Sequence, residues 1–402
     1  MNFNHTRRAC NTGYVTQAIV LNLAPLLFVI FQNKFHVSLG FLAFLTLVTF
    51  LIQIAIDVIA VRFVERFGYR FLAVSSQFVS AAGLVMMSFL PSVIMPELGL
   101  LAATLVYSSG SALAEVVLSP LAEGLPGDGK GGASLALLHS FYAWGQTAVI
   151  LVTTGLLVLL TDPLWWIVPL IWALVPIFNG IMFLMVPMIP MAESDTKHDG
   201  VKLFRYKYFA LAFLLMICSG ASEQAMAQWA SYYAERGLSI SKTVGDLLGP
   251  CIFALMMALG RTYYGIKGAK LNLNRALLLC SILTFGCYMT AVFAPIPLLS
   301  LAAVGLAGLG CSLMWPGMLS VSAVRFPRAG AAMFALMAVG GDIGCSLGPW
   351  LTGTVSDIIE KYPGDLAGPL LEQHALKAGF LVGSIFPLVM IFGMIAFCKK
   401  KK

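Results

Sequence analysis

Twelve long apolar runs constrain this chain more than any other feature of its sequence. Each run is long enough for a helix that crosses a bilayer, which takes roughly 20 mainly apolar residues. None shows the alternation over about ten residues that is typical of membrane β-strands. We therefore predict an all-α membrane protein with twelve transmembrane helices. The runs are 11–31, 39–61, 71–90, 97–122, 133–159, 163–188, 208–234, 243–266, 275–293, 297–323, 329–353 and 374–397.

The scarcity of charge excludes several classes of protein. Charged residues make up only 11% of the 402 residues and hydrophobic residues 59%, against about 25% and 45–50% in ordinary soluble domains. A soluble enzyme, a disordered chain and a collagen-like chain are therefore unlikely classes on composition. We find no metal-ligand cluster and no nucleotide-binding loop, because Gly131 follows Lys130 where a phosphate-binding loop needs Ser or Thr. We expect no cofactor and no enzyme activity.

The basic residues predict the orientation of the chain in the membrane. With the N-terminus inside, 20 Lys and Arg residues fall on the inner side and 5 on the outer side. Arg261, next to the end of the eighth run, is among the inner ones. This asymmetry follows the positive-inside rule, so we expect a multi-pass plasma (inner) membrane protein with both termini in the cytosol. The net charge of +7 is then explained without a nucleic-acid partner.

The chain divides into two halves that look related. We predict an N-terminal six-helix half at 1–190, a cytosolic connector at 191–207 and a C-terminal six-helix half at 208–402. Gly110 matches Gly310 at an offset of 200, and Gly145 matches Gly344 at an offset of 199. Near-equal offsets in corresponding runs favour a six-plus-six duplication, and internal repeats are common in secondary transporters.

One inner loop carries a family resemblance. The segment 61–70, VRFVERFGYR, resembles the G-x-x-x-D-R-x-G-R-R loop of the major facilitator superfamily, with Glu65, Arg66, Gly68 and Arg70 in register. The resemblance implies a two-fold-repeated fold and transport by alternating access. It also implies a gating role for this loop, and we expect Asp57, near the inner end of the second run, to join the same charge network.

The first half resembles the fucose/glucose/galactose:cation symporter branch of that superfamily. Glu115 precedes Pro120 by five residues in the fourth run, as in that branch, and 139–145, HSFYAWG, resembles its start of span five. The branch's span-one aspartate is absent, and Asn22 to Pro25 stand there. The resemblance implies cation-coupled sugar uptake. Drug:proton antiporters carry a glycine-proline motif in span five, and 139–160 contains no proline.

Three carboxylates lie well inside apolar runs, several residues from either end: Glu115, Glu223 and Asp342. A charged side chain at mid-membrane costs about 2.5–3.5 kcal/mol on insertion scales, so each should face a cavity or a partner. We predict that these three couple a cation to transport. The alternative for each is a structural hydrogen bond between helices.

Polar and aromatic side chains on the same runs are candidates for binding the solute. Gln224, Gln228 and Ser231 recur on one helical face, and His139, Tyr142 and Gln146 share another. Amides suit a polyhydroxylated or amide-bearing solute because they both donate and accept hydrogen bonds. The alternative for each residue is packing. The full candidate set is Tyr14, Gln17, Asn22, His139, Tyr142, Gln146, Gln224, Gln228, Trp229, Tyr232 and Trp315.

Together these features predict a secondary transporter for a sugar or similar small polar solute. We favour symport with protons over sodium, and a monomer in the lipid bilayer. The first alternative is a proton-coupled exporter of amphipathic compounds, which the Met-rich and aromatic runs would serve. The second is a receptor or scaffold without transport, for which the short loops offer little surface.

Overall fold

The computed structural model describes residues 1–37, 39–126, 132–160, 164–189, 200–267, 271–326, 330–362 and 368–398. Helices form nearly all of these residues, and none of the described residues lies in a strand. Contacts along the chain divide it into two compact units, Met1–Asp195 and Thr196–Lys402. The all-α prediction is confirmed, whereas the predicted connector 191–207 falls largely outside the described residues.

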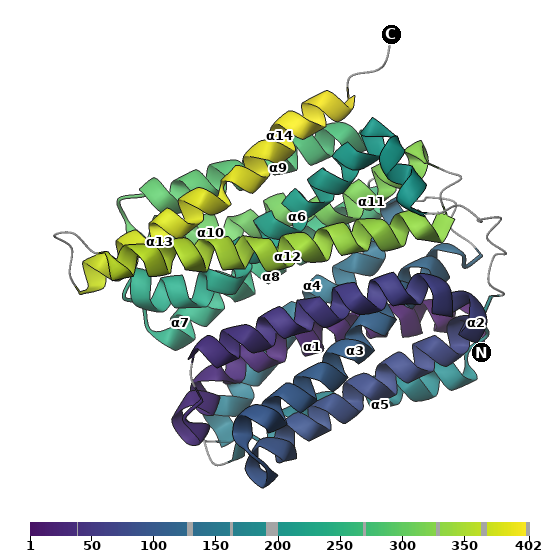
Figure 1. The fold of residues 1–402 in the computed structure, drawn as a ribbon, viewed down its shortest axis with the longest axis horizontal. Helices are drawn as coiled ribbons and strands as arrows, with labels where there is room; N and C mark the ends of the chain where they lie inside the picture. Colours follow the sequence, from purple (N-terminus) through teal and green to yellow (C-terminus); the bar gives the residue numbers. More distant parts are fainter. Residues whose placement is uncertain are drawn as a thin grey trace. The chain divides into compact units, whose positions relative to one another are not determined.

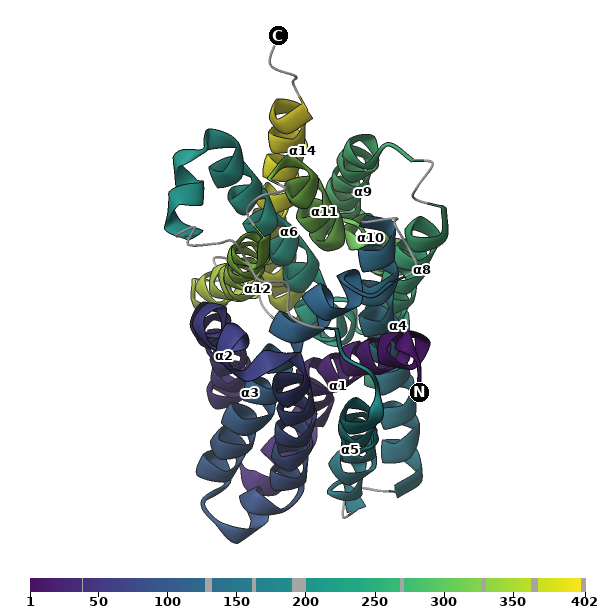
Figure 2. The same cartoon turned by 90° about the vertical axis from the view of Figure 1, so that its right-hand side faces the viewer.

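Unit 1 (Met1–Asp195) is a bundle of long helices, seen in purple, blue and, for its last helix, teal in Figures 1 and 2. Its longest element, α2, covers the second and third predicted runs. Gly68 interrupts it with φ 73° and ψ 160°, so α2 consists of two helices joined at this residue. The helices are α1 (Phe3–Phe35), α2 (Leu39–Val93), α3 (Pro96–Glu123), α4 (Gly132–Leu160) and α5 (Ile167–Met185).

Unit 2 (Thr196–Lys402) contains more interrupted helices than unit 1. The predicted tenth run is divided between α10 and α11, and the predicted twelfth between α13 and α14. Two π-helical turns, η3 and η4, flank α7, and π-helical turns are frequent at functional sites. The elements are η2 (Gly200–Arg205), α6 (Lys207–Tyr232), η3 (Tyr233–Gly237), α7 (Lys242–Asp246), η4 (Leu247–Cys251), α8 (Ile252–Lys267), α9 (Leu273–Phe293), α10 (Pro297–Cys311), α11 (Met314–Arg325), α12 (Gly330–Lys361), α13 (Pro369–Gly383) and α14 (Ile385–Cys398).

Nine helices of the described residues are long and apolar enough to cross a membrane. They correspond to the third to tenth and the twelfth predicted runs. The eleventh run lies in α12, the first in α1, and the second in the first part of α2, where Phe44–Ile59 is a shorter apolar helix. The correspondence supports a multi-pass helical membrane protein.

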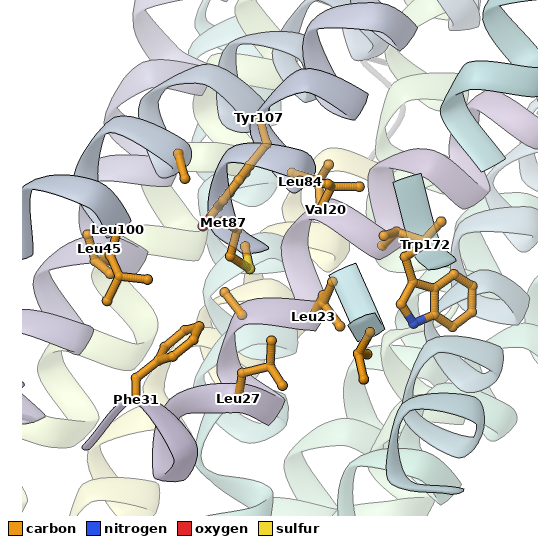
Figure 3. Close-up of a cluster of buried hydrophobic side chains, with 14 of the residues drawn as sticks. Val20, Leu23, Leu27, Phe31, Leu45, Leu84, Met87, Leu100, Tyr107 and Trp172 are labelled. Atoms are coloured by element: carbon orange, nitrogen blue, oxygen red, sulfur yellow. The ribbon is translucent and has the colours of Figure 1, made fainter. Parts of the chain in front are cut away.

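A large apolar cluster fills part of unit 1 (Figure 3). It joins α1, α2, α3, α4 and α5, with Leu23 and Leu27 contributed by α1, Leu100 by α3 and Val149 by α4. Phe31 packs edge-on against Trp165, with ring centroids 5.4 Å apart. The polar side chains described below therefore lie in a unit that also has a dry, tightly packed region.

Glycines at the matched offsets allow the same close contacts in each unit. A Cβ at Gly145 in α4 would lie 3.0 Å from the Cα of Val15 in α1, and one at Gly344 in α12 would lie 2.8 Å from the backbone nitrogen of Ala221 in α6. Likewise Gly110 in α3 packs on α2, and Gly310 in α10 packs on α9. Corresponding helix pairs thus approach through corresponding glycines, as expected of a duplication.

We expect Gly68→Ala to destabilise the protein because φ 73° with ψ 160° is a backbone region adopted almost only by glycine. The expected loss is about 1–3 kcal/mol, read as a lower melting temperature in detergent. Gly155→Ala is the matched control, since Gly155 is helical and no atom lies within 4 Å of its would-be Cβ. Equal melting temperatures for the two variants would contradict the strain at Gly68.

Candidate functional site

Glu115 is held by two amides in unit 1. Gln17 of α1 donates from Nε2 to Oε2 of Glu115 at 2.6 Å, and Gln53 of α2 donates from Nε2 to the same oxygen. Both glutamines are buried, and Glu115 itself is half-buried. Gln17 was predicted to bind the solute, which stays a prediction, and Gln53 was not among the predicted site residues. Its position four residues before Asp57 on one helical face was the available signal.

A second polar group surrounds Tyr14. The Tyr14 hydroxyl hydrogen-bonds Ser119 Oγ and lies 3.4 Å from His139 Nε2. The Tyr14 and His139 rings meet edge to face, with centroids 4.8 Å apart. These contacts join α1, α3 and α4, and Ser119 lies one helical turn beyond Glu115.

A third polar group centres on Asn22 of α1. Gln146 donates from Nε2 to Oδ1 of Asn22 at 3.0 Å, and Asn22 donates from Nδ2 to the Tyr142 hydroxyl at 3.4 Å. His139, Tyr142 and Gln146 follow the predicted face of α4. The structure thus brings the candidate solute-binding residues of the first half into contacts among α1, α3 and α4, and these groups can donate and accept hydrogen bonds.

Glu223 in unit 2 has a different partner. Arg261 of α8 donates from Nη2 to Oε2 of Glu223 at 3.1 Å, with side chains only 4% and 9% exposed. Arg261 also donates from Nε to the Ser312 carbonyl at 3.0 Å, where α10 ends. The prediction that placed Arg261 in an inner loop is wrong, because the carboxylate of Glu223 compensates its charge inside the helical unit.

The other candidates of α6 differ in their surroundings. Gln224 and Gln228 are half-buried, while Trp229 donates from Nε1 to the Pro349 carbonyl at 3.1 Å. The side chain of Tyr232 lies outside the described residues. Ser231 donates to Oδ1 of Asp246, a buried carboxylate at the end of α7 that the sequence analysis missed. Asp246 lies near the end of its apolar run, where an ordinary boundary charge is expected.

Trp315 and Asp342 lie at the contact between α11 and α12. A Cβ at Gly341 would overlap the Trp315 ring, so this glycine makes room for the indole. Asp342 is the next residue of α12 and its side chain is buried. The indole therefore has a packing contact, and its predicted role in binding the solute stays a prediction.

In the inner loop 61–70, the structure describes the side chain of Arg70 but not those of Glu65 and Arg66. Glu65 and Arg66 fall among the side chains outside the described set, so their predicted gating contacts stay predictions. Arg70 donates to the carbonyls of Phe183, Leu184 and Val186 at 3.1, 2.7 and 3.0 Å. These bonds satisfy carbonyls left free at the end of α5. Asp57 is fully buried in α2.

We expect each single substitution of the Glu223–Arg261 pair to destabilise the protein more than the double substitution does. Glu223→Gln or Arg261→Gln leaves one buried charge uncompensated, which costs about 3–5 kcal/mol, whereas removing both charges is far less harmful. Melting temperatures of the two single variants and the double variant in detergent measure this coupling. Arg275→Gln, at an exposed position of α9, is the control, and strictly additive losses would contradict the coupling.

Three comparisons with known proteins bear on this arrangement. The family model of the Major Facilitator Superfamily matches residues 12–349. The fold is similar to the crystal structure of FucP, a Major Facilitator Superfamily transporter, in the outward conformation, with a TM-score of 0.74 and 15% identity over 98% of this chain and 99% of that one. A variant of the E. coli fucose:proton symporter FucP gives a TM-score of 0.72 at 15% identity, again over 98% and 99% of the chains. No curated protein sequence matches significantly. The family match covers well over half of the chain, and the chain belongs to the Major Facilitator Superfamily of multi-pass membrane transporters, which are not enzymes.

Proposed function

We propose that this secondary transporter takes up a sugar or similar small polar solute together with a proton. The observation that carries the proposal is the environment of Glu115, a carboxylate in a membrane-spanning helix that accepts hydrogen bonds from two neutral amides. A proton can neutralise Glu115 without leaving a cation uncompensated. Such a change of charge can shift the equilibrium between the two conformations of an alternating-access transporter.

Glu223 is less suited to the same task. Its carboxylate forms a buried ion pair with Arg261, so protonation would leave the guanidinium without its counter-ion, and a buried unpaired charge is strongly unfavourable. We therefore assign coupling to Glu115 first and assign Glu223 a structural role. Asp342 stays a candidate for coupling, because it is buried in α12 beside Gly341.

The solute class follows from the chemistry around Asn22 and Tyr14. Two groups of side chains from α1 and α4 offer hydrogen bonds: Tyr14 lies within hydrogen-bonding distance of His139, and Asn22 bonds Tyr142 and Gln146. Groups that donate and accept, with an aromatic ring nearby, suit a solute that carries several hydroxyls and an apolar face. The similar solved structures include a fucose:proton symporter, which makes L-fucose, D-galactose and D-glucose the first solutes to test.

We expect Glu115→Gln to abolish accumulation driven by a proton gradient and to keep solute exchange. Glutamine has the shape of protonated glutamate but cannot release a proton, so a bound solute can still cross while coupling is lost. The measurement compares uptake of radiolabelled sugars into proteoliposomes, acidic outside, with counterflow at equal pH.

Glu97→Gln is the matched control, because Glu97 lies in the first turn of the same helix, far along the chain from Glu115. Uptake by the unsubstituted protein that persists undiminished with a protonophore and without sodium would contradict symport. Uptake that requires sodium would replace the proton as the coupling ion. Protection of cells from amphipathic toxic compounds, without sugar uptake, would favour the exporter instead.

A further inference from the structure

The amides of Asn22 and Gln146 form a chain of hydrogen bonds with a fixed direction. Asn22 donates from Nδ2 to the Ala18 carbonyl at 2.9 Å, one turn earlier in α1. A backbone carbonyl can only accept a hydrogen bond, so the nitrogen of the Asn22 amide must face it and the oxygen must face away. That oxygen, Oδ1, accepts from Gln146 Nε2 at 3.0 Å. One carbonyl of α1 therefore sets the direction of the whole chain.

This direction uses up the donors of Asn22. A side-chain amide has two N–H groups, and the nitrogen of Asn22 has two acceptors, the Ala18 carbonyl and the Tyr142 hydroxyl at 3.4 Å. Its oxygen can accept two hydrogen bonds, and among the described residues only Gln146 supplies one. Asn22 is half-buried, so its amide can be approached. To a solute it offers an acceptor and no further donor.

Gln146 ends the chain with a second acceptor. Its oxygen, Oε1, is buried and makes no hydrogen bond within the described part of the chain, and Gln146 as a whole is 5% exposed. Turning the amide over would set the Gln146 oxygen against the oxygen of Asn22. Buried polar atoms without partners are uncommon and call for an explanation. The direction of the chain thus leaves an acceptor whose donor the described residues do not supply.

We propose that Asn22 Oδ1 and Gln146 Oε1 form an acceptor pair that selects solutes by their hydrogen-bond donors. A sugar meets this requirement with two neighbouring hydroxyl groups, one donating to each oxygen. The helices of an alternating-access transporter rearrange around the solute, which gives a donor access to an oxygen that is closed off in one conformation. The pair rejects a compound that offers only acceptors at these positions, such as a methyl ether or a fluorinated sugar.

This selection rests on the proposed uptake of a polar solute and goes further, because it fixes which partner of each hydrogen bond the solute must be. The hydroxyl of Tyr14 and the imidazole of His139 can donate or accept, so they discriminate little between donors and acceptors on a solute. The Asn22–Gln146 pair cannot exchange roles without breaking the bond to the Ala18 carbonyl. Donor selection is therefore a property of the contact between α1 and α4.

The test is competition for uptake into proteoliposomes that contain the full-length protein. The probes are the monodeoxyfluoro derivatives of whichever of L-fucose, D-galactose and D-glucose is taken up best, one derivative for each hydroxyl. Fluorine occupies the place of a hydroxyl but cannot donate a hydrogen bond. We expect at least one position at which fluorine lowers the apparent affinity about tenfold, because it leaves a buried acceptor unpaired.

Gln146→Met should remove that loss, because the variant has no acceptor for the sugar hydroxyl to satisfy. The fluorinated and parent sugars should then compete almost equally at that position, while discrimination at the other positions stays. Thr147→Val is the matched control, since the Thr147 hydroxyl donates to the Ala143 carbonyl of its own helix. This variant should discriminate as the unsubstituted protein does.

A measurement without solute decides the case in which none of the three sugars is taken up. Gln146→Met removes one hydrogen bond and also one unpaired buried acceptor, and the two effects on stability oppose each other. Thr153→Val, in the same helix, instead leaves the indole N–H of Trp172 without its partner. We expect Gln146→Met to melt at a clearly higher temperature in detergent than Thr153→Val.

The outcomes separate donor selection from the proposed function. If a sugar is taken up but Gln146→Met keeps the discrimination at every position, donor selection fails and the proposed uptake stands. If no sugar is taken up, the proposed sugar uptake fails, and donor selection stands or fails with the melting temperature of Gln146→Met relative to Thr153→Val. Discrimination lost at one position in Gln146→Met, and kept in Thr147→Val, supports both.

Discussion

Carboxylates inside apolar helices are the constraint on which the rest of this structure depends. Lipid offers no solvation, so each buried charge requires partners from neighbouring helices. Glu115 meets this need with amides from α1 and α2, and Glu223 meets it with a guanidinium from α8. The partners of Glu115 require α3 to contact α1 and α2, and the partner of Glu223 requires α6 to contact α8. The position of each carboxylate therefore constrains the helix packing of its unit.

The two solutions differ in how they respond to a proton. Amides stabilise an ionised carboxylate, yet they remain neutral when it is protonated, so the local charge can change by one without leaving an unpaired cation. An ion pair such as Glu223–Arg261 resists that change because the arginine stays charged in proteins. Arg261 also bonds the Ser312 carbonyl, where α10 ends. The same arginine therefore supports a helix interruption and pairs with the carboxylate of Glu223, which suits a fixed element better than a switch.

The sequence predicted the helical membrane fold and the candidates of the first half because periodicity places Tyr14, Gln17, His139 and Gln146 on defined faces of apolar runs. It did not predict the partner of Glu223, since helical spacing relates residues within one helix but says nothing about which neighbouring helix faces them. Arg261 lay close to a run's end and was taken for a loop residue. Gln53 was missed for a related reason: Asp57 follows it by four residues on the same face, but spacing within α2 does not show that Gln53 contacts Glu115 of α3.

Two glycines at close helix contacts of unit 1 lie directly before buried polar residues. Gly145 brings α4 close to α1 and is followed directly by Gln146, which donates to Asn22 of α1. Gly110 brings α3 close to Ser76 and Ser80 of α2 and is followed directly by the buried Ser111. At the matched positions Gly310 and Gly344 make the same close approaches, but Cys311 and Cys345 follow them. The duplicated packing is thus common to both units, while the residue beside each glycine is polar only in unit 1, and a difference in function between the halves can arise without a difference in fold.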